Sequence, residues 1–302
     1  VLEIGTGSGY QAAVLSPLVK EVYSIEIVEA LGKKAAKTLE ELNYKNVFTK
    51  VGDGYLGWPE KAPFDKIIVT CNPEKVPQAL VDQLADGGMM VVPVGERYQQ
   101  MLYLFRKKGE KLESVALRPT LFVPMTGKAE DNREKKPDPL HPKVENGSFE
   151  EVAKSEDKNF VPGWYYHRLV TWQEDSKSPD GKHCILLENS IAGRASHLLQ
   201  GFPVDGSQIE ELEVSAWVKT EDVVAGRERF ESPLVAVTFY DGERRDLGTV
   251  WIGPFRGTEP WHEVTKTFRV PATAKEGILR LGLFGATGKI WYDGVSMKAV
   301  PR

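Results

Sequence analysis

VLEIGTGSGYQAAVLS, residues 1–16, is the stretch that decides the fold of the first part of the chain. An apolar run, residues 1–4, leads directly into three alternating glycines and then into helix-forming residues. A glycine-rich turn between a strand and a helix lets a ligand approach the backbone, and the start of the helix offers unpaired N–H groups. This order predicts the first strand of a parallel sheet with a ligand site at its edge. Because the stretch begins at once with a strand and without Met, we expect the chain to be part of a longer reading frame.

Composition excludes several classes of protein. A chain of 302 residues is long enough for two domains that each bury a core. The formal net charge is -4, from 39 Lys and Arg against 43 Asp and Glu, and no long basic run appears, so we expect no binding to nucleic acid or anionic lipid. No run of about 18 apolar residues occurs, so we expect no membrane-spanning helix in this sequence. Cys71 and Cys184 lie far apart, which predicts neither a disulfide framework nor a thiolate metal site.

Alternating apolar runs and helical patterns in residues 1–128 predict a parallel α/β sheet. The expected strands are residues 1–4, 22–25, 47–51, 66–70 and 89–94. The spacing of Val28, Leu31, Ala35, Leu39 and Leu42 predicts one buried helix face, and a second helix starts near Val76 and ends at Gly87-Gly88. Residues 100–106 and 112–117 predict an antiparallel hairpin that closes the sheet.

A change of composition separates a second domain. Residues 129–144 carry charges and three prolines with little to bury, which predicts a semi-extended linker. Residues 145–302 contain six of the seven tryptophans, among short alternating runs separated by turn residues. No helix-length pattern occurs there, so we expect an all-β sandwich of the jelly-roll type. The predicted fold class is therefore α/β plus all-β.

The glycine turn and two acidic residues predict the ligand. Dinucleotides and S-adenosylmethionine both use such a turn, but the dinucleotide fingerprint needs glycine at the sixth place, where this chain has Tyr10. The spacing therefore favours the methyl donor. Glu26, at the end of the second strand, is placed to accept hydrogen bonds from ribose hydroxyls, and Asp53, after the third, from an adenine amino group. The simpler interpretation of Asp53 is a turn-forming residue.

Three blocks of residues 1–130 resemble the protein-L-isoaspartate O-methyltransferase family. They are VLEIGTGSGYQAAVLS, VGDGYLGWPEKAPFDKIIVTCNPEKVPQALVDQLADGGMMVVPVG and LFVPMTGKAE, in the family's order and spacing. The resemblance implies a Rossmann-like class I methyltransferase sheet and transfer of methyl from S-adenosyl-L-methionine to isoaspartyl carboxylates in damaged proteins. It implies that the following residues bind the donor: Gly5, Thr6, Gly7, Ser8, Gly9, Glu26, Asp53, Gly54 and Thr126.

Two departures from the family pattern keep alternatives open. Cys71-Asn72-Pro73 stands where the family often has small residues, which allows a different methyl acceptor. The family's amino-terminal helices and its Gln-Thr-Ile-Ser type segment, which lines the isoaspartyl pocket, are not in this sequence, so we also consider a chain that binds donor without turnover. An ionised carboxylate acceptor needs alignment and desolvation more than acid–base help, so we name no catalytic residue. The five histidines show no metal-ligand spacing, and we expect no metal.

The second domain resembles carbohydrate-binding jelly-roll modules of bacterial enzymes. The resemblance rests on ENGSFEE, PGWY, LEVSAWVKT, EPWHEVTKTFRVP and KIWYDGVSM. It implies a binding or tethering module for a glycan or a protein. The rings of Trp164, Trp172 and Trp251 could stack on such a ligand, although core packing is the commoner role of such rings. A third hypothesis is therefore a carbohydrate- or protein-binding protein with an inactive methyltransferase domain. We expect a cytoplasmic protein, with export left open.

Overall fold

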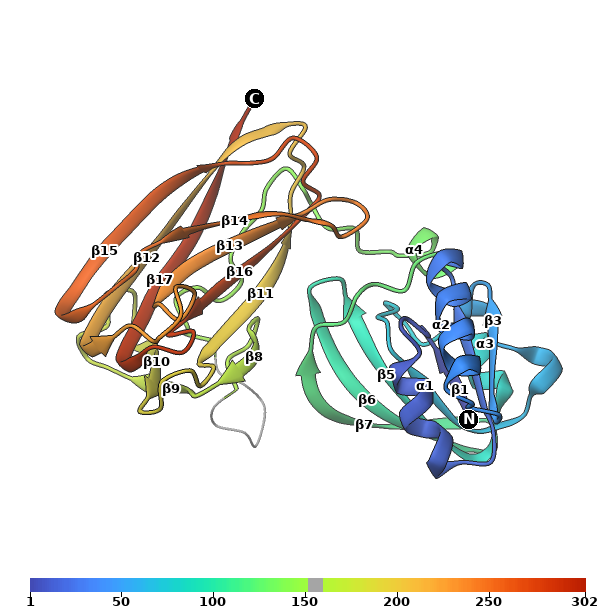
Figure 1. Ribbon diagram of the computed structural model, residues 1–302. Coiled ribbons are helices and arrows are strands. Elements are labelled where there is room, and N and C mark those ends of the chain that lie inside the picture. Colours follow the sequence, from blue (N-terminus) through green and yellow to red (C-terminus); the bar gives the residue numbers. More distant parts are fainter. Residues whose placement is uncertain (152–159) are drawn as a thin grey trace. The chain divides into compact units, whose positions relative to one another are not determined.

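The computed structural model describes residues 1–151 and 160–302. The chain divides into two compact units, residues 1–136 and 137–302 (Figure 1). The first is an α/β unit built on a seven-stranded sheet, and the second contains two five-stranded sheets. The predicted fold class, α/β followed by an all-β sandwich, is confirmed.

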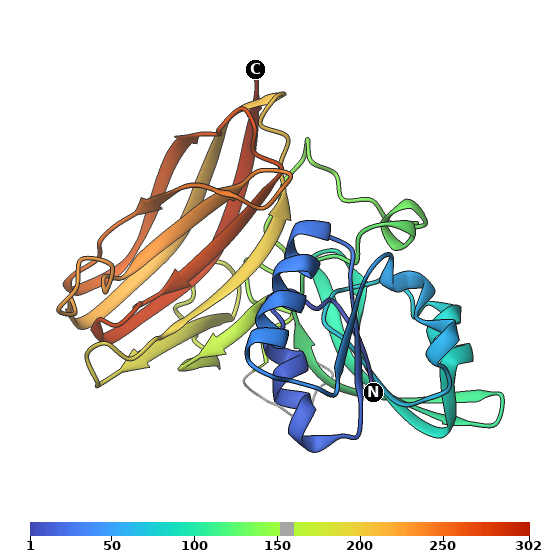
Figure 2. The same cartoon turned by 45° about the vertical axis from the view of Figure 1, so that its right-hand side comes forward.

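The sheet of the first unit has the strand order β3-β2-β1-β4-β5-β6-β7. Its strands are β1 (Leu2–Ile4), β2 (Val22–Glu26), β3 (Val47–Val51), β4 (Phe64–Val69), β5 (Leu84–Glu96), β6 (Gln99–Lys108) and β7 (Lys111–Thr120). The helices are α1 (Tyr10–Leu15), α2 (Glu29–Glu41), α3 (Gln78–Gln83) and α4 (Lys128–Asp131), with short 3-10 helices η1 (Ser16–Leu18), η2 (Gly54–Leu56) and η3 (Pro59–Lys61). Strands β1 to β5 run parallel, and β6 and β7 are antiparallel. The helices α1 and α2 cover one face of the sheet, and α3 covers the other (Figure 2).

The buried face of α2 differs from the prediction. Ala35 and Leu39 are buried as expected, but Val28, Leu31 and Leu42 are exposed, Leu31 to 44%. The helix instead turns Gly32 toward the sheet, where an added Cβ would lie 2.9 Å from a methyl group of Val51. The missing side chain at Gly32 therefore lets the helix lie close on the sheet, which hydrophobic spacing does not reveal.

The helix before β5 is shorter than predicted. It ends at Gln83, and Leu84 already pairs with Phe64 of β4, so Gly87-Gly88 lies inside the strand. Gly87 has a φ of +73° and the pairing between β4 and β5 changes register after Phe64. The two glycines thus allow an irregular strand rather than ending a helix.

The predicted linker begins as part of the first unit. Residues 128–131 form α4, and the Arg133 side chain is fully buried. The predicted 1–128 domain thus corresponds to a compact unit of residues 1–136, and residues 137–144 belong to the second unit by their contacts. Charge and proline content do not reveal this packing, because a buried arginine looks like a surface residue in the sequence. The buried Arg133 side chain is held by hydrogen bonds to Glu130 and to the Asn72 carbonyl oxygen.

The second unit is a sandwich of two antiparallel sheets. Their orders are β15-β12-β17-β10-β9 and β14-β13-β16-β11-β8. The strands are β8 (Tyr165–Arg168), β9 (Val170–Glu174), β10 (His183–Asn189), β11 (His197–Pro203), β12 (Ile209–Val224), β13 (Leu234–Tyr240), β14 (Asp246–Ile252), β15 (Gly257–Arg269), β16 (Glu276–Gly282) and β17 (Thr287–Pro301).

Alternation along the strands builds the sandwich core. In β13, for example, Val235, Val237 and Phe239 point into one hydrophobic cluster shared by both sheets. Trp164 is fully buried in that cluster, so its ring is part of the core. Trp251 is instead 42% exposed on the outer face of β14. The tryptophans that sequence could not tell apart therefore divide between core and surface.

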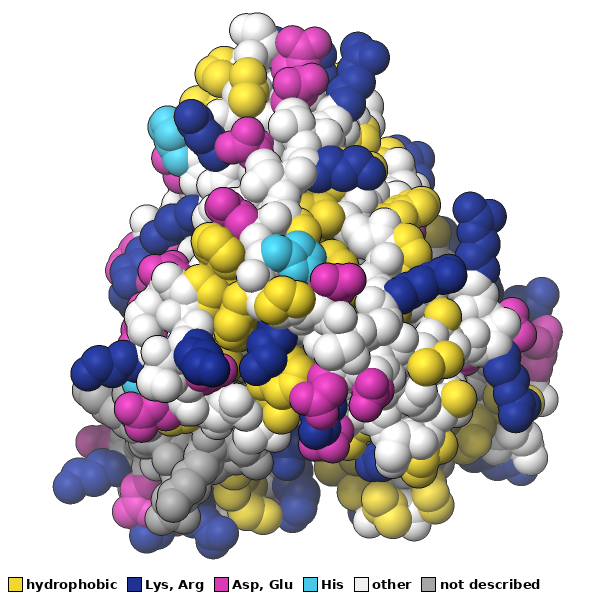
Figure 3. Space-filling view, turned by 90° about the vertical axis from the view of Figure 1, so that its left-hand side faces the viewer, with side chains coloured by type: hydrophobic (Ala, Val, Ile, Leu, Met, Phe, Trp, Pro, Cys, Tyr) yellow, Lys and Arg dark blue, Asp and Glu magenta, His cyan; other side chains and the backbone are white. Residues whose placement is uncertain are grey.

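Charges of both signs are mixed on the surface shown in Figure 3. Lys and Arg side chains lie among Asp and Glu side chains there, and hydrophobic side chains gather near the middle of that face. No helix among the described residues is long and apolar enough to cross a membrane.

Candidate functional site

Most of the predicted ligand-binding residues lie at one edge of the parallel sheet. The strand β1 pairs with β2 on one side and with β4 on the other. The strands that follow β1 in sequence are thus added first on one side of it and then on the other, which makes β1 the switch point of the strand order. Ligands of open parallel sheets bind at the carboxyl ends of the strands beside such a switch point. The glycine turn follows β1, Glu26 ends β2, and Asp53 follows β3, which brings all three to this edge.

The glycine turn after β1 has the backbone conformation that glycine favours. Gly5, Gly7 and Gly9 all have positive φ angles, +97°, +55° and +84°. Ile25 O accepts hydrogen bonds from the N–H groups of Gly5 and Thr6, which fixes the turn against β2. Around the ideal Cβ position of Gly7 no atom lies within 4 Å, so the backbone is open to a ligand there.

Glu26 links the glycine turn to the start of α2. The residue is 7% exposed, and its carboxylate accepts hydrogen bonds from the N–H of Gly7 (2.8 Å) and from the N–H of Val28 (3.0 Å). Each carboxylate oxygen has a further lone pair, so these bonds orient the group without exhausting it as an acceptor. The Glu26 carboxylate therefore lies beside the open backbone of Gly7 and can accept further hydrogen bonds there.

Asp53 links the third strand to the segment that precedes α4. One oxygen accepts from the N–H of Tyr55 and caps η2, and the other accepts from the N–H of Lys128, both at 2.9 Å. Gly127 permits this approach, because an added Cβ there would lie 2.6 Å from Asp53 Oδ2. Gly54, the first residue of η2, packs tightly against β1, since an added Cβ would meet the side chain of Ile4. Asp53 is thus a turn-forming residue, as the simpler interpretation predicts. Each of its carboxylate oxygens also has a further lone pair that can accept a hydrogen bond from a ligand.

Thr126 is exposed between two fixed points of the backbone. Just before it, the N–H of Met125 donates to Asn72 O (2.8 Å), and Pro124 forms a parallel bridge with Asn72 beyond the end of β4. Just after it, the bond from Lys128 N to Asp53 ties down the chain. Thr126 therefore lies at the same edge of the sheet as Asp53, while Ser8 is exposed on the glycine turn.

A buried polar chain beneath the glycine turn was missed by sequence reasoning. Thr6 Oγ1 lies 2.6 Å from Ser24 Oγ, and Ser24 donates to Glu3 Oε2 at 2.5 Å. Glu3 is fully buried, its Oε1 has no hydrogen-bond partner among the described residues, and burial raises its pKa to about 7. The signal available in the sequence was an acidic residue at an inward position of a strand that is otherwise apolar.

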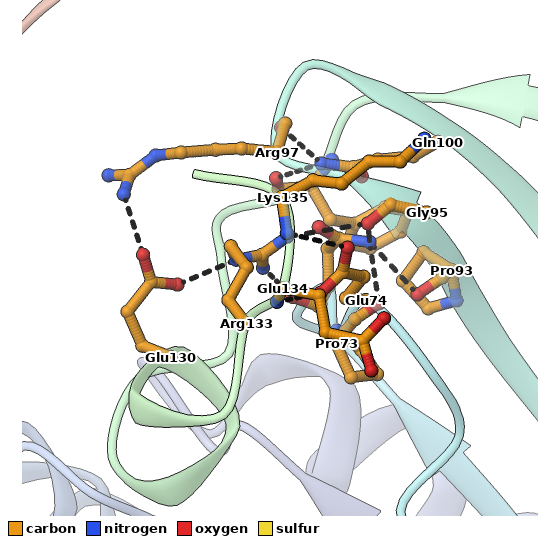
Figure 4. Close-up of polar contacts among 12 residues, drawn as sticks. Pro73, Glu74, Pro93, Gly95, Arg97, Gln100, Glu130, Arg133, Glu134 and Lys135 are labelled. Carbon is orange, nitrogen blue, oxygen red and sulfur yellow. Dashed lines mark hydrogen bonds and ion pairs between the residues drawn. The ribbon is translucent and has the colours of Figure 1, made fainter. Parts of the chain in front are cut away.

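A second polar cluster fixes the loops after β4 and β5 (Figure 4). The Arg133 guanidinium donates to Asn72 O (3.2 Å) and Gly95 O (3.4 Å), and pairs with Glu130 at 3.0 Å. The Asn72 side chain is also buried and donates from Nδ2 to carbonyl oxygens of Pro73, Pro93 and Gly95. Asn72, where the sequence departs from the family pattern, thus holds the backbone of these loops in place.

Cys71, which precedes Asn72, also departs from the family pattern. Its thiol is close enough to the carboxylates of Glu26 and Asp53 for their charges to affect it. Burial raises the pKa of its thiol to about 12, and the charges of Glu26 and Asp53 contribute to the same shift. A protonated thiol is a weak nucleophile. Among the described residues no three His, Cys, Asp or Glu side chains are grouped to hold a metal.

These groups fit a ligand that carries hydroxyl and amino donors. The open backbone at Gly7 and the oriented carboxylates of Glu26 and Asp53 offer space and acceptors at one edge of the sheet. A nucleoside with ribose hydroxyls and an adenine amino group matches that set. The arrangement is therefore compatible with an adenosyl donor.

Comparison with protein families and relatives concerns the first unit. A model of the family protein-L-isoaspartate(D-aspartate) O-methyltransferase matches residues 1–130. The protein-L-isoaspartate O-methyltransferase of Gloeobacter violaceus is 55% identical over 128 residues, which are 42% of this chain and 62% of that protein. That of Opitutus terrae is 56% identical over 127 residues, 42% of this chain and 54% of that protein. The chain thus spans less than two thirds of the length of these two relatives.

Comparison with solved structures gives matches of two kinds. One is described as a β-aspartate methyltransferase (PCMT) from Plasmodium falciparum in complex with S-adenosyl-L-homocysteine, with a TM-score of 0.37, 26% identity, and coverage of 41% of this chain and 64% of that one. Another is a family 16 carbohydrate-binding module, with a TM-score of 0.34, 17% identity, and coverage of 51% of this chain and 98% of that one.

Proposed function

We propose that residues 1–130, which the protein-L-isoaspartate(D-aspartate) O-methyltransferase family model matches, form such a domain and transfer a methyl group from S-adenosyl-L-methionine to the carboxylate of isoaspartyl residues. The observation that carries the proposal is the family match over the same residues that place the glycine turn, Glu26 and Asp53 at one sheet edge. Proteins and peptides that contain isoaspartate would be the substrates, and the reaction would serve protein repair.

The donor would be held by residues whose geometry is already fixed. The glycine turn would receive the methionine end of the donor, because the backbone around Gly7 is open. Glu26 would accept from the ribose hydroxyls, and Asp53 with Gly54 would accept and enclose the adenine. Thr126 would lie near the donor, at the same edge of the sheet as Asp53. When bound, the donor supplies an electrophilic methyl group on a sulfonium.

The protein's contribution to the reaction would be alignment and exclusion of water. A carboxylate acceptor is ionised at neutral pH and needs no base, so the rate gain comes from orienting the two reactants, up to about 7 to 11 kcal/mol. The Arg133 and Asn72 contacts support this role because they hold the loops after β4 and β5 in one arrangement. Cys71 would serve as a neutral wall rather than as a nucleophile.

The acceptor remains the part of the proposal that an experiment must decide. Full-length relatives are longer than the matched segment, and Cys71 changes the surface beside the donor residues. A methyltransferase with another acceptor is therefore the second candidate. A binding protein with an inactive donor domain is the third candidate. It is supported by the exposed ring of Trp251 on the second unit, which is available to stack on a ligand.

The deciding experiment measures methyl transfer from labelled S-adenosylmethionine to two matched peptides, one with isoaspartate and one with aspartate. Base-labile label on the isoaspartyl peptide alone supports the proposal. Donor binding without label on either peptide contradicts it and directs the search to other acceptors. Retention on a glycan or protein without any turnover supports the third candidate. Removal of residues 145–302 should leave donor affinity unchanged, since the donor residues all belong to the first unit.

A further inference from the structure

The second unit has a large pocket on the outer face of one sheet. Its volume is about 1060 Å³, and its walls come from the strands β13, β14 and β16 and from the loops around residues 225–232 and 254–256. Val235 and Val237 of β13 point into the core, so Leu234 and Ala236, which line the pocket, point outward. The pocket is thus separate from the sandwich core.

The register of the strands explains the hollow shape. Ala236 pairs with Trp251 on one side and with Arg280 on the other, which places a small side chain between two large ones. In the next row Gly282 lies between Leu234 and His197. The small side chain of Ala236 thus leaves room in the pocket between the larger side chains of Trp251 and Arg280.

The pocket gathers arginines that are far apart in the sequence. Arg227, Arg229, Arg256 and Arg280 line it, against one carboxylate, Glu228. None of these four guanidinium groups forms an ion pair with another described residue. The Arg280 Nε is buried without a hydrogen-bond partner, although another nitrogen of the group donates to Thr238. The pocket lining therefore carries an excess of positive charge.

Neighbouring groups agree with this electrostatic picture. Burial lowers the pKa of His197, and the positive charges of Arg168 and Arg280 lower it further. Its ring stacks on Phe284 with centroids 5.8 Å apart. Glu231, the other acidic residue of the 225–232 loop, accepts hydrogen bonds from the backbone N–H groups of Arg227 and Glu228 and so serves the loop itself.

Apolar side chains are exposed beside the arginines. Phe230 is 72% exposed and Trp251 is 42% exposed, and both line the pocket. Arginine and aromatic residues are the types that carry most of the binding energy in protein interfaces. A polypeptide offers apolar side chains to Phe230 and carboxylates to the arginines in one ligand, and a saccharide offers no comparable apolar side chain.

We propose that this pocket binds an acidic polypeptide segment in which carboxylate side chains alternate with apolar ones. The carboxylates pair with Arg256 and Arg280, and the apolar side chains pack on Trp251 and Phe230. This inference rests on the second unit alone and is independent of the proposed methyl transfer.

The test measures binding of a fluorescein-labelled peptide of alternating Glu and Leu to the full chain by fluorescence anisotropy. A peptide with Gln in place of each Glu and a fluorescein-labelled oligogalacturonate serve as comparison ligands. The double variant R256Q/R280Q should lower affinity for the acidic peptide at least about tenfold. R269Q, which removes an exposed charge from β15 outside the pocket, should leave it unchanged.

A variant independent of Arg280 guards against loss of folding. Trp251→Ala on the edge strand should also weaken the acidic peptide, and the thermal midpoint of each variant reports its folding. Equal binding of the Gln peptide, or unchanged affinity in R256Q/R280Q, overturns the proposal. Binding of the oligogalacturonate but not of the peptide assigns the pocket to acidic saccharides and overturns it as well, as does binding of none of the three ligands.

Discussion

Glu26 Oε2 accepts a 2.8 Å hydrogen bond from the backbone N–H of Gly7, which belongs to the preceding strand-turn-helix unit. The bond connects the glycine turn to the end of β2, so the carboxylate and the open backbone of Gly7 keep a fixed relation. Two features that sequence reasoning treated separately are one structural element.

Glu26→Ala should weaken binding of S-adenosylhomocysteine by about 1.5 to 3 kcal/mol, because bonds to a charged acceptor are lost. Isothermal titration calorimetry measures this change. Glu26→Gln is the matched variant, since its amide keeps one acceptor oxygen, and we expect a smaller loss. Unchanged affinity in Glu26→Ala would remove the carboxylate from the donor site.

Gly127→Ala should lower both stability and donor affinity. Its φ is +75°, and the new Cβ would lie 2.6 Å from Asp53 Oδ2 and displace that carboxylate. The control is Gly109→Ala, where φ is +58° and no atom lies within 4 Å of an added Cβ. We expect Gly127→Ala to cost at least about 1 kcal/mol more than the control in urea denaturation. Equal costs would show that the contact with Asp53 is unimportant.

Glu3 should make the first unit less stable as the pH rises. Its pKa is about 7 when folded, against an ordinary value of 4.5, so between these values the folded chain binds more protons than the unfolded one. The free energy of unfolding therefore falls by about 3 kcal/mol from acidic to neutral pH. Denaturation at a series of pH values should show that Glu3→Gln lacks this decline. Parallel curves for the two proteins would contradict a buried, protonated Glu3.

Arg133→Met should destabilise the first unit by about 2 to 4 kcal/mol, because it leaves the Asn72 and Gly95 carbonyl oxygens without their buried donor. Arg118→Met is the control, since Arg118 is exposed on β7. Thermal unfolding of the two variants in the full chain measures the difference. A similar effect of both substitutions would contradict the structural role of Arg133 and indicate that residues 132–136 are a linker.

The positions of the strands in the first unit could be predicted because their signals are local. The glycine turn after β1 and the apolar runs of β2 to β5 follow from chain direction and hydrophobicity. The hairpin of β6 and β7 was expected at nearly its observed place. The carboxyl-edge positions of Glu26 and Asp53 then follow from parallel pairing alone.

Features that depend on tertiary contact could not be read from the sequence. Gly32 turns α2 toward the sheet through the absence of a side chain, so hydrophobic spacing selected Leu31 instead. Arg133 is buried by carbonyl oxygens from distant loops, and its charge made the segment look like a linker. The arginines of the second-unit pocket come from three segments, so the sequence contains no basic run to announce them.

The two cysteines have a practical consequence for chemical labelling. Cys184 is fully buried, and burial raises the pKa of its thiol to about 12, as it does for Cys71. Maleimides react with thiolates, so both native thiols should react slowly at neutral pH. A single cysteine introduced at an exposed position would then take one fluorophore selectively. Labelled protein for the binding experiments can thus be prepared without removing either native cysteine.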